Sequence, residues 1–268
     1  MKKIQLSGAD IAVSDQGRGE TPVVLLHGFL CSSDMWRHQV AELASTTRTL
    51  TLDFPGHGES RALTTDYPFT EDGFADLTAS LLERLGISSA VLVGFSMGGG
   101  VALNVAARYP RLVAGLFLAD VGGGSVDVEE HRASMHRVAD RIDNGEFSAA
   151  VEDFLVSPTF VDYVNRSADC RSHMETMMLG CDPSRISSVL RGVLAGRAPI
   201  SERPVEDIKV PTHVLVGALD QQCRLPASEL FNRIPGAAFT SLADAGHMTP
   251  VEEPEAFTGE LRQFLRRM

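Results

Sequence analysis

Short apolar segments alternate with amphipathic segments along most of this 268-residue chain. Short apolar runs are typical of strands buried inside a sheet, whereas apolar residues spaced three and four apart are typical of helices. The expected strands are residues 23–26, 47–52, 90–94, 113–119, 212–216 and 238–242. The expected helices are residues 34–44, 72–85, 97–108, 227–234 and 254–267. This alternation predicts an α/β fold, with a mostly parallel sheet flanked by helices.

The first residues of the chain depart from that order. Residues 4–6 and 10–13 are separated by the segment SGAD, and this pattern predicts an antiparallel hairpin at one edge of the sheet. The hairpin adds two strands to the six above, so we expect a sheet of eight strands. Ser33 and Thr70 are expected to cap the N-termini of the first two helices.

The alternation stops between residues 122 and 204, where no convincing strand pattern occurs. Helical patterns occur there instead, over residues 128–144, 148–156, 160–168 and around 183–194. An insertion of this kind predicts a cap over the carboxyl edge of the sheet. We therefore expect a core formed by residues 1–121 and 205–268, and a helical cap formed by residues 122–204.

The segment Gly94-Phe95-Ser96-Met97-Gly98 has the form G-x-S-x-G and lies between an expected strand and an expected helix. This is the context of a nucleophile elbow, a sharp turn that holds a serine in a strained backbone conformation. Glycines are needed on both sides because larger side chains would collide across the turn. A serine that merely caps the helix is the alternative.

A nucleophilic serine needs a base, and the base needs a carboxylate that orients it. Asp220 and His247 each follow an expected strand, so both are predicted at the same sheet edge as Ser96. Their chain order, Ser then Asp then His, is that of a Ser-His-Asp triad on this type of sheet. Asp120, at the end of another strand, and Asp244, three residues before the histidine, are the alternative acids.

The turn after the first parallel strand predicts a second part of the same site. His27-Gly28 lets the chain turn tightly, so the backbone N–H of Phe29 is expected to face Ser96. The N–H of Met97, which follows the serine, would be the second donor of an oxyanion hole.

Five segments of the chain, LLHGF, TLDFPGHGES, VGFSMGG, VGALD and AGHMTPVEEP, carry a resemblance to a known family. In this order and spacing, the sequence resembles the α/β-hydrolase superfamily over essentially its whole length. The resemblance implies a serine hydrolase similar to esterases, lactonases or cofactor-free haloperoxidases. It also implies that His57, within DFPGHGES, is architectural rather than reactive.

These residues predict cleavage of a small apolar carboxylic ester or lactone through an acyl-enzyme. The scheme requires neither a metal nor a diffusible cofactor. The residues expected to line the substrate pocket are Trp36, Phe95, Phe154, Phe160, Met174, Met178 and Met248. The alternatives are hydrolysis of a carbon–carbon bond in a ring-fission product, thioesterase or perhydrolase activity, and a non-catalytic small-ligand receptor. Phe95 disfavours carbon–carbon cleavage, because relatives with that activity often have asparagine there.

The net charge and the hydropathy of the chain argue against several other classes of binding partner. The chain has 24 Lys and Arg against 35 Asp and Glu, a net charge of −11, which argues against nucleic acid and anionic membranes. No apolar stretch approaches the length of a membrane span, and the N-terminus lacks the apolar core of a secretory signal. We therefore expect a cytoplasmic monomer or homodimer with its four cysteines reduced.

Overall fold

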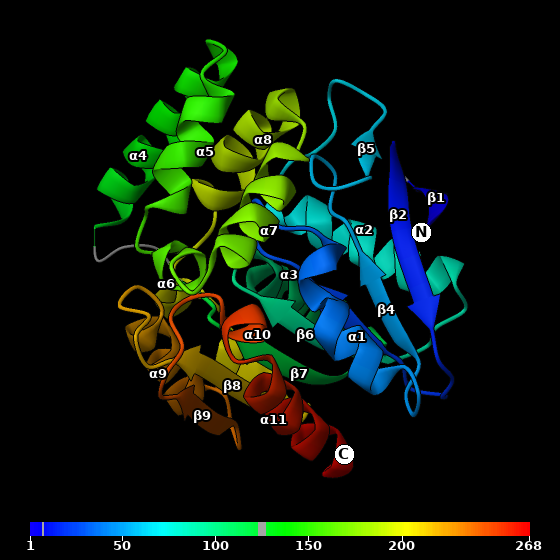
Figure 1. Ribbon diagram of the computed structural model, residues 1–268. Coiled ribbons are helices and arrows are strands. Elements are labelled where there is room, and N and C mark those ends of the chain that lie inside the picture. The colour runs from blue at the N-terminus through cyan, green and yellow to red at the C-terminus, as the bar shows by residue number, and fades with distance from the viewer. Residues whose placement is uncertain (7, 123–126) are drawn as a thin grey trace.

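The computed structural model describes residues 1–6, 8–122 and 127–268. Within these residues a single sheet has the strand order β1-β2-β4-β3-β6-β7-β8-β9, and the two-residue strand β5 pairs with β2 (Figure 1). The strands are β1 (Lys2–Leu6), β2 (Ala9–Gln16), β3 (Val23–Leu26), β4 (Thr49–Leu52), β5 (Arg61–Ala62), β6 (Ala90–Phe95), β7 (Val113–Ala119), β8 (Thr212–Gly217) and β9 (Ala238–Leu242). The eight expected strands are all present, and β5 is an addition to them.

Strand direction follows the predicted pattern. β1 pairs with β2 antiparallel, and β2 pairs with β4 antiparallel. The remaining neighbours along the sheet, from β4 through β3, β6, β7 and β8 to β9, pair in parallel. All residues of β3, β4, β6 and β8 are buried, as expected for strands covered on both faces. The predicted α/β fold with a mostly parallel sheet is confirmed.

Helices cover both faces of this sheet. α1 and α11 contact each other on the face nearer the viewer in Figure 1, while α2 and α3 contact each other on the far face. α9 packs beside β8. The bounds of the core helices are α1 (Arg37–Leu43), α2 (Glu71–Arg84), α3 (Met97–Arg108), α9 (Arg224–Arg233), α10 (Thr249–Glu252) and α11 (Pro254–Arg266).

One of the two predicted helix caps is confirmed and the other is wrong. Thr70 Oγ1 accepts a hydrogen bond from the N–H of Gly73 at 2.9 Å, at the start of α2. At the first helix, the side chain of Ser32 rather than Ser33 accepts a hydrogen bond from the N–H of Asp34. A 3-10 turn, η1 (Ser33–Trp36), precedes α1, so the cap is one residue earlier than predicted and the α-helix begins three residues later.

Helices also form the segment between β7 and β8. They are α4 (Val128–Asp143), α5 (Phe147–Leu155), α6 (Val161–Val164), α7 (Ala168–Leu179), α8 (Pro183–Val189) and the π-helical turn η3 (Leu190–Leu194). The helix expected over 160–168 is wrong in extent, because only the short α6 forms there. α7 was not predicted. The chain returns to β8 through two short turns, η4 (Ile200–Glu202) and η5 (Val205–Asp207).

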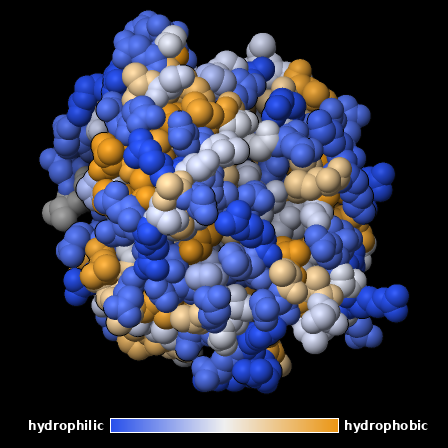
Figure 2. All heavy atoms as spheres, in the orientation of Figure 1, coloured by the Kyte–Doolittle hydropathy of each residue, from blue (hydrophilic) through white to orange (hydrophobic). Residues whose placement is uncertain are grey.

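The interior is apolar and the surface is mixed. Valine, leucine, isoleucine and phenylalanine side chains from both the sheet and the cap helices form one buried cluster. On the face shown in Figure 2, apolar side chains occur in small groups among hydrophilic ones. Each helix in the described part of the chain is too short or too polar to span a membrane.

Candidate active site

Ser96 lies in a turn between the last residue of β6 and the first residue of α3. Its φ of 51° and ψ of −113° place a non-glycine residue in a region that L-amino acids rarely adopt. The N–H of Ser96 donates to the carbonyl of Ala119 on the neighbouring strand at 2.9 Å, which holds the turn in place. An added Cβ at Gly94 would lie 2.5 Å from the carbonyl oxygen of Gly98, and one at Gly98 would lie 2.2 Å from that of Leu26. The turn therefore requires glycine on both sides of the serine.

A chain of hydrogen bonds connects Ser96, His247 and Asp220. Ser96 Oγ lies 3.0 Å from His247 Nε2, and His247 Nδ1 lies 2.7 Å from Asp220 Oδ2. Because Nδ1 faces a carboxylate, it carries the ring proton and donates it, which leaves Nε2 to accept from the serine hydroxyl. The three side chains come from loops after β6, β8 and β9, as expected for the carboxyl edge of a parallel sheet.

The charged forms of Asp220 and His247 stabilise each other. Burial alone would raise the pKa of Asp220, but hydrogen bonds and the charge of His247 outweigh burial and hold that pKa below its usual value. Two backbone N–H groups, of Gln222 and Cys223, also donate to Asp220 Oδ1. For His247, burial lowers the pKa, but the hydrogen bond and the charge of Asp220 raise it overall. The pair is therefore arranged to stabilise a protonated imidazole.

The two alternative acids have other contacts. Asp120 is completely buried, and its side-chain oxygens form hydrogen bonds with the N–H of Gly217 and the hydroxyl of Thr249. Burial raises the pKa of Asp120 to about 8. Asp244 is exposed, and its backbone carbonyl accepts from the cap residue Arg166. Asp220 is thus the carboxylate that is hydrogen-bonded to the histidine ring.

A glutamate that the sequence analysis did not single out holds the histidine loop. Glu252, in the short helix α10, accepts hydrogen bonds at 2.8 Å from the N–H groups of Gly246 and Met248, on either side of His247. Arg166 from the cap donates to the carbonyl of Glu252 at 2.7 Å and pairs with its carboxylate at 3.3 Å. The sequence signal that could have indicated Glu252 is an acidic residue in the first helix after His247.

The two predicted oxyanion donors are free to bind a ligand. Within the described residues, neither the N–H of Phe29 nor that of Met97 donates a hydrogen bond to another residue. His27 fixes the turn that carries Phe29: its Nε2 accepts from the N–H of Phe54 at 2.9 Å, so its Nδ1 donates to the carbonyl of Gly28 at 2.7 Å. Met97 is the first residue of α3, so its N–H lies at the positive end of that helix, directly after Ser96.

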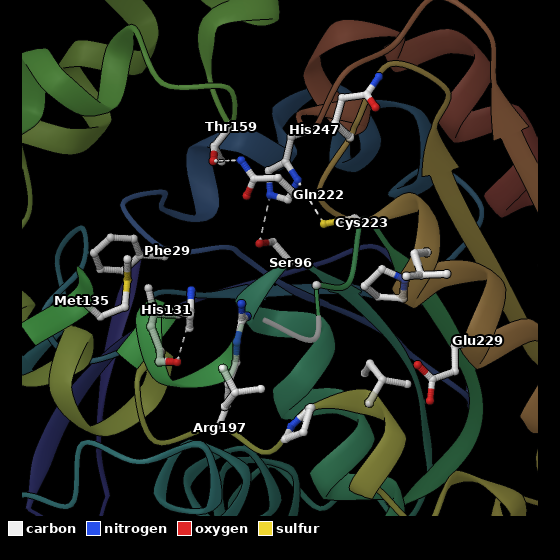
Figure 3. Close-up of a pocket in the computed structure, with 18 of the residues that line it drawn as sticks. Phe29, Ser96, His131, Met135, Thr159, Arg197, Gln222, Cys223, Glu229 and His247 are labelled. Atoms are coloured by element: carbon white, nitrogen blue, oxygen red, sulfur yellow. Dashed lines mark hydrogen bonds between the residues drawn. The ribbon is translucent and has the colours of Figure 1, made fainter. Parts of the chain in front are cut away.

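A cavity of about 690 Å³ opens above the serine, between the sheet and the cap (Figure 3). Of the seven residues expected to line it, three do: Phe95, Phe154 and Phe160. The cavity also has lining residues outside those seven, among them His131, Met135, Thr159, Leu194 and Arg197. These come mainly from the cap and its return segment, whose packing is not visible in the sequence.

The other four expected pocket residues lie outside the lining of this cavity, so their assignment to it is corrected. Trp36 is fully buried and its ring lies 6.0 Å from that of Phe257 in α11. Met174 and Met178 are fully buried in the apolar cluster that packs the cap. Met248 is also buried, in the loop held by Glu252. Each of these side chains fills space between elements instead of facing the cavity.

Among the described residues, one group has ligand atoms close enough together to hold a metal ion: Asp220, Cys223 and His247, within 4.8 Å of one another. Cys223 Sγ lies 3.5 Å from His247 Nδ1. A metal at this position would have to replace the hydrogen bond between His247 and Asp220, so the geometry favours proton transfer over metal binding.

A family model described as the alpha/beta hydrolase family matches residues 23–260. The chain belongs to the alpha/beta hydrolase family. The predicted resemblance is therefore confirmed.

This α/β-hydrolase is similar to proteins of several named activities. It is 28% identical over 262 residues to a putative 2-succinyl-6-hydroxy-2,4-cyclohexadiene-1-carboxylate synthase of Bacillus subtilis, covering 96% of this chain and 95% of that protein. A malate-bound structure of a thermophilic esterase from Thermogutta terrifontis matches with a TM-score of 0.89 and 29% identity, over 100% and 99% of the two chains. The enol-lactonase from Burkholderia xenovorans LB400 matches with a TM-score of 0.88 and 25% identity, over 99% and 100%.

Proposed function

We propose that this α/β-hydrolase is a serine hydrolase that cleaves a carboxylic ester or a lactone through a covalent acyl-enzyme. The observation that carries the proposal is the continuous hydrogen-bond chain from Ser96 through His247 to Asp220, at 3.0 and 2.7 Å. The serine of this hydrogen-bond chain lies in a strained elbow, and among the described residues the N–H groups of Phe29 and Met97 donate to no other residue. The names of two structural neighbours, an esterase and an enol-lactonase, support the same reaction class.

The first half of the reaction transfers the acyl group to the serine. His247 Nε2 takes the hydroxyl proton of Ser96 as its Oγ attacks the carbonyl carbon, and the carbonyl π electrons move to the oxygen. The resulting oxyanion accepts hydrogen bonds from the N–H groups of Phe29 and Met97. The carbon–oxygen bond to the alcohol then breaks, and His247 returns the proton to the departing oxygen.

The second half restores the enzyme. A water molecule gives a proton to His247 as its oxygen attacks the acyl carbon, and the second tetrahedral intermediate uses the same oxyanion donors. Collapse of this intermediate releases the carboxylic acid and returns the proton to Ser96 Oγ. Asp220 holds the imidazole in the required tautomer and stabilises its charged form in both halves.

The test is turnover of 4-nitrophenyl esters of increasing acyl length and of aryl and macrocyclic lactones by Ser96→Ala beside the wild-type protein. We expect kcat for the best substrate to fall by at least about a thousandfold, because the nucleophile is lost. Ser148→Ala, an exposed position in the cap helix α5, is the matched serine control and should keep wild-type rates. Wild-type turnover by Ser96→Ala would rule the proposal out.

A second candidate is a reaction that proceeds without a covalent acyl intermediate, because the similar Bacillus subtilis protein is named a putative synthase and not a hydrolase. Intact-protein mass spectrometry separates the two. The serine hydrolase predicts that a 4-nitrophenyl ester, rapidly quenched, leaves one acyl group on the wild-type chain and none on Ser96→Ala. Turnover with no acyl adduct under any quench condition would favour the second candidate.

A further inference from the structure

Arg197 projects into the same cavity as Ser96, from the segment that follows η3 (Figure 3). Its Nε atom is buried and has no hydrogen-bond partner within the part of the chain that the structure describes. Among the described residues, no carboxylate lies within ion-pair distance of its guanidinium. The five remaining residues, Ser7 and 123–126, include no acidic side chain in the sequence. This guanidinium therefore has unused donors that face the substrate cavity.

The charged groups near Arg197 do not balance, and one positive charge remains in excess. Glu71, the acid that most favours the charged form of Arg197, is already bound to Arg203 at 2.5 Å. Cys223 is a neutral thiol, because burial raises its pKa well above the usual value. Burial lowers the pKa of Arg197, but a guanidinium stays protonated at neutral pH. No neighbouring group compensates this charge fully.

The other charged residues around the cavity do not provide that compensation either. Glu229 pairs with Arg233 at 3.0 Å, and Glu202 is exposed. His131 is the remaining basic side chain of the cap in the lining, and burial lowers its pKa below the usual value. Among the described residues that line the cavity, Arg197 is thus the one strong cation, and Ser96 and His247 line the same cavity.

A buried charge without a partner is costly, and a buried guanidinium is normally paired with an anion. Its planar donors match the two oxygens of a carboxylate. A single cation suits a carboxylate better than a doubly charged phosphate. The cavity lining also includes apolar side chains, among them Phe95, Leu194 and Ile200.

We propose that Arg197 binds a free carboxylate of the substrate, so that the substrate is an ester or lactone that also carries a carboxylate. Such a molecule places its reactive carbonyl at Ser96, an apolar segment along the wall, and its anionic end at Arg197. The nature of the substrate as an ester or lactone rests on the serine hydrolase activity proposed above. The binding of a carboxylate by Arg197 rests on the geometry of the cavity.

The kinetic test compares matched pairs of esters. Mono-4-nitrophenyl succinate, glutarate and adipate are each paired with the same compound in which the free carboxyl is masked as a methyl ester. For the best chain length, we expect wild-type kcat/KM to favour the free carboxylate by about tenfold to a hundredfold, the range for one charge-assisted interaction. Arg197→Gln should remove this preference mainly through KM, and should leave the masked ester within about threefold of wild type.

Two further variants show whether charge at this position is responsible. Arg197→Lys should recover part of the preference, because it keeps the charge but loses the planar fork. Arg171→Gln removes a cap arginine that pairs with Glu152 outside the cavity, and should keep the full preference. Equal kcat/KM for both esters in the wild-type protein, or an equal loss for both in Arg197→Gln, would overturn the proposal.

A binding experiment separates this inference from the proposed reaction. Calorimetric titration of Ser96→Ala with monomethyl glutarate and with dimethyl glutarate needs no turnover. We expect the monoanion to bind at least about tenfold more tightly, and the difference to disappear in Ser96→Ala/Arg197→Gln. If wild-type protein hydrolyses no ester but this difference is found, the proposed reaction fails and the carboxylate site stands. If esters are hydrolysed but the two ligands bind equally tightly, the proposed carboxylate site is wrong and the proposed reaction is unaffected.

Discussion

Two aspartates at the ends of neighbouring strands differ in role because their surroundings differ. Asp220 accepts from His247 and from two backbone N–H groups, so it is stabilised as a carboxylate. Asp120 is fully buried between Gly217 and Thr249, and its pKa is raised to about 8 by burial. The sequence placed both at the same sheet edge and favoured Asp220, but hydrogen-bond partners from distant loops decide between them.

Replacing each aspartate with asparagine tests this difference. Asp220→Asn should lower kcat by about 10⁴-fold, because an amide favours the wrong histidine tautomer. Asp120→Asn should stay within about tenfold of wild type, because the amide can accept from the N–H of Gly217 and donate to the hydroxyl of Thr249. Steady-state rates with the best 4-nitrophenyl ester measure both. A larger loss in Asp120→Asn than in Asp220→Asn would reverse the assignment.

Among the elements, β6 and α3 were the most predictable, because the turn between them depends on local sequence. The predicted helix 97–108 has the observed bounds, and the glycines around Ser96 have the predicted steric role. The cap was less predictable. In α7, residues 168–179, apolar side chains gather toward the C-terminal end instead of following a clear helical period, so the helix was missed. Tertiary packing also decided which cap methionines are buried, and the sequence contains no signal for that choice.

A pair of glycine substitutions tests the packing of the elbow. Gly98→Ala should lower the free energy of unfolding by about 2 kcal/mol or more, because its Cβ would lie 2.2 Å from the backbone oxygen of Leu26. Gly259→Ala, inside α11 and with no atom within 4 Å of the new Cβ, should instead raise it by about 0.5–1 kcal/mol. Urea unfolding measures both values. Equal stability of the two variants would contradict the close approach of α3 to β3.

At the scale of the whole molecule, burial of Asp120 couples stability to pH. In the unfolded chain this carboxyl has a pKa near its ordinary value of about 3.9, whereas in the folded protein the pKa is about 8. The folded state holds a proton that the unfolded state has lost between these values. Its contribution to stability is therefore fully present below about pH 4 and is lost as the pH rises through about 8.

Asp120→Asn removes this dependence. We expect its Tm, relative to the wild-type protein, to increase from pH 5 to pH 9, as measured by circular dichroism at matched ionic strength. Asp66→Asn, at an exposed position, is the control and should show a constant difference from wild type over the same range. A constant difference for Asp120→Asn as well would show that Asp120 titrates alike in the folded and unfolded states.

The helical segment between β7 and β8 is one continuous insertion between two strands that pair directly with each other. The chain therefore passes from sheet to cap once and returns once. A recombination event with two crossover points could exchange the whole cap, with Phe154 and Arg197, while the loops that carry Ser96, Asp220 and His247 stay in place. With the roles proposed for these residues, reaction chemistry and ligand preference are encoded on separate stretches of the gene, so the second can diversify between generations while the first is retained.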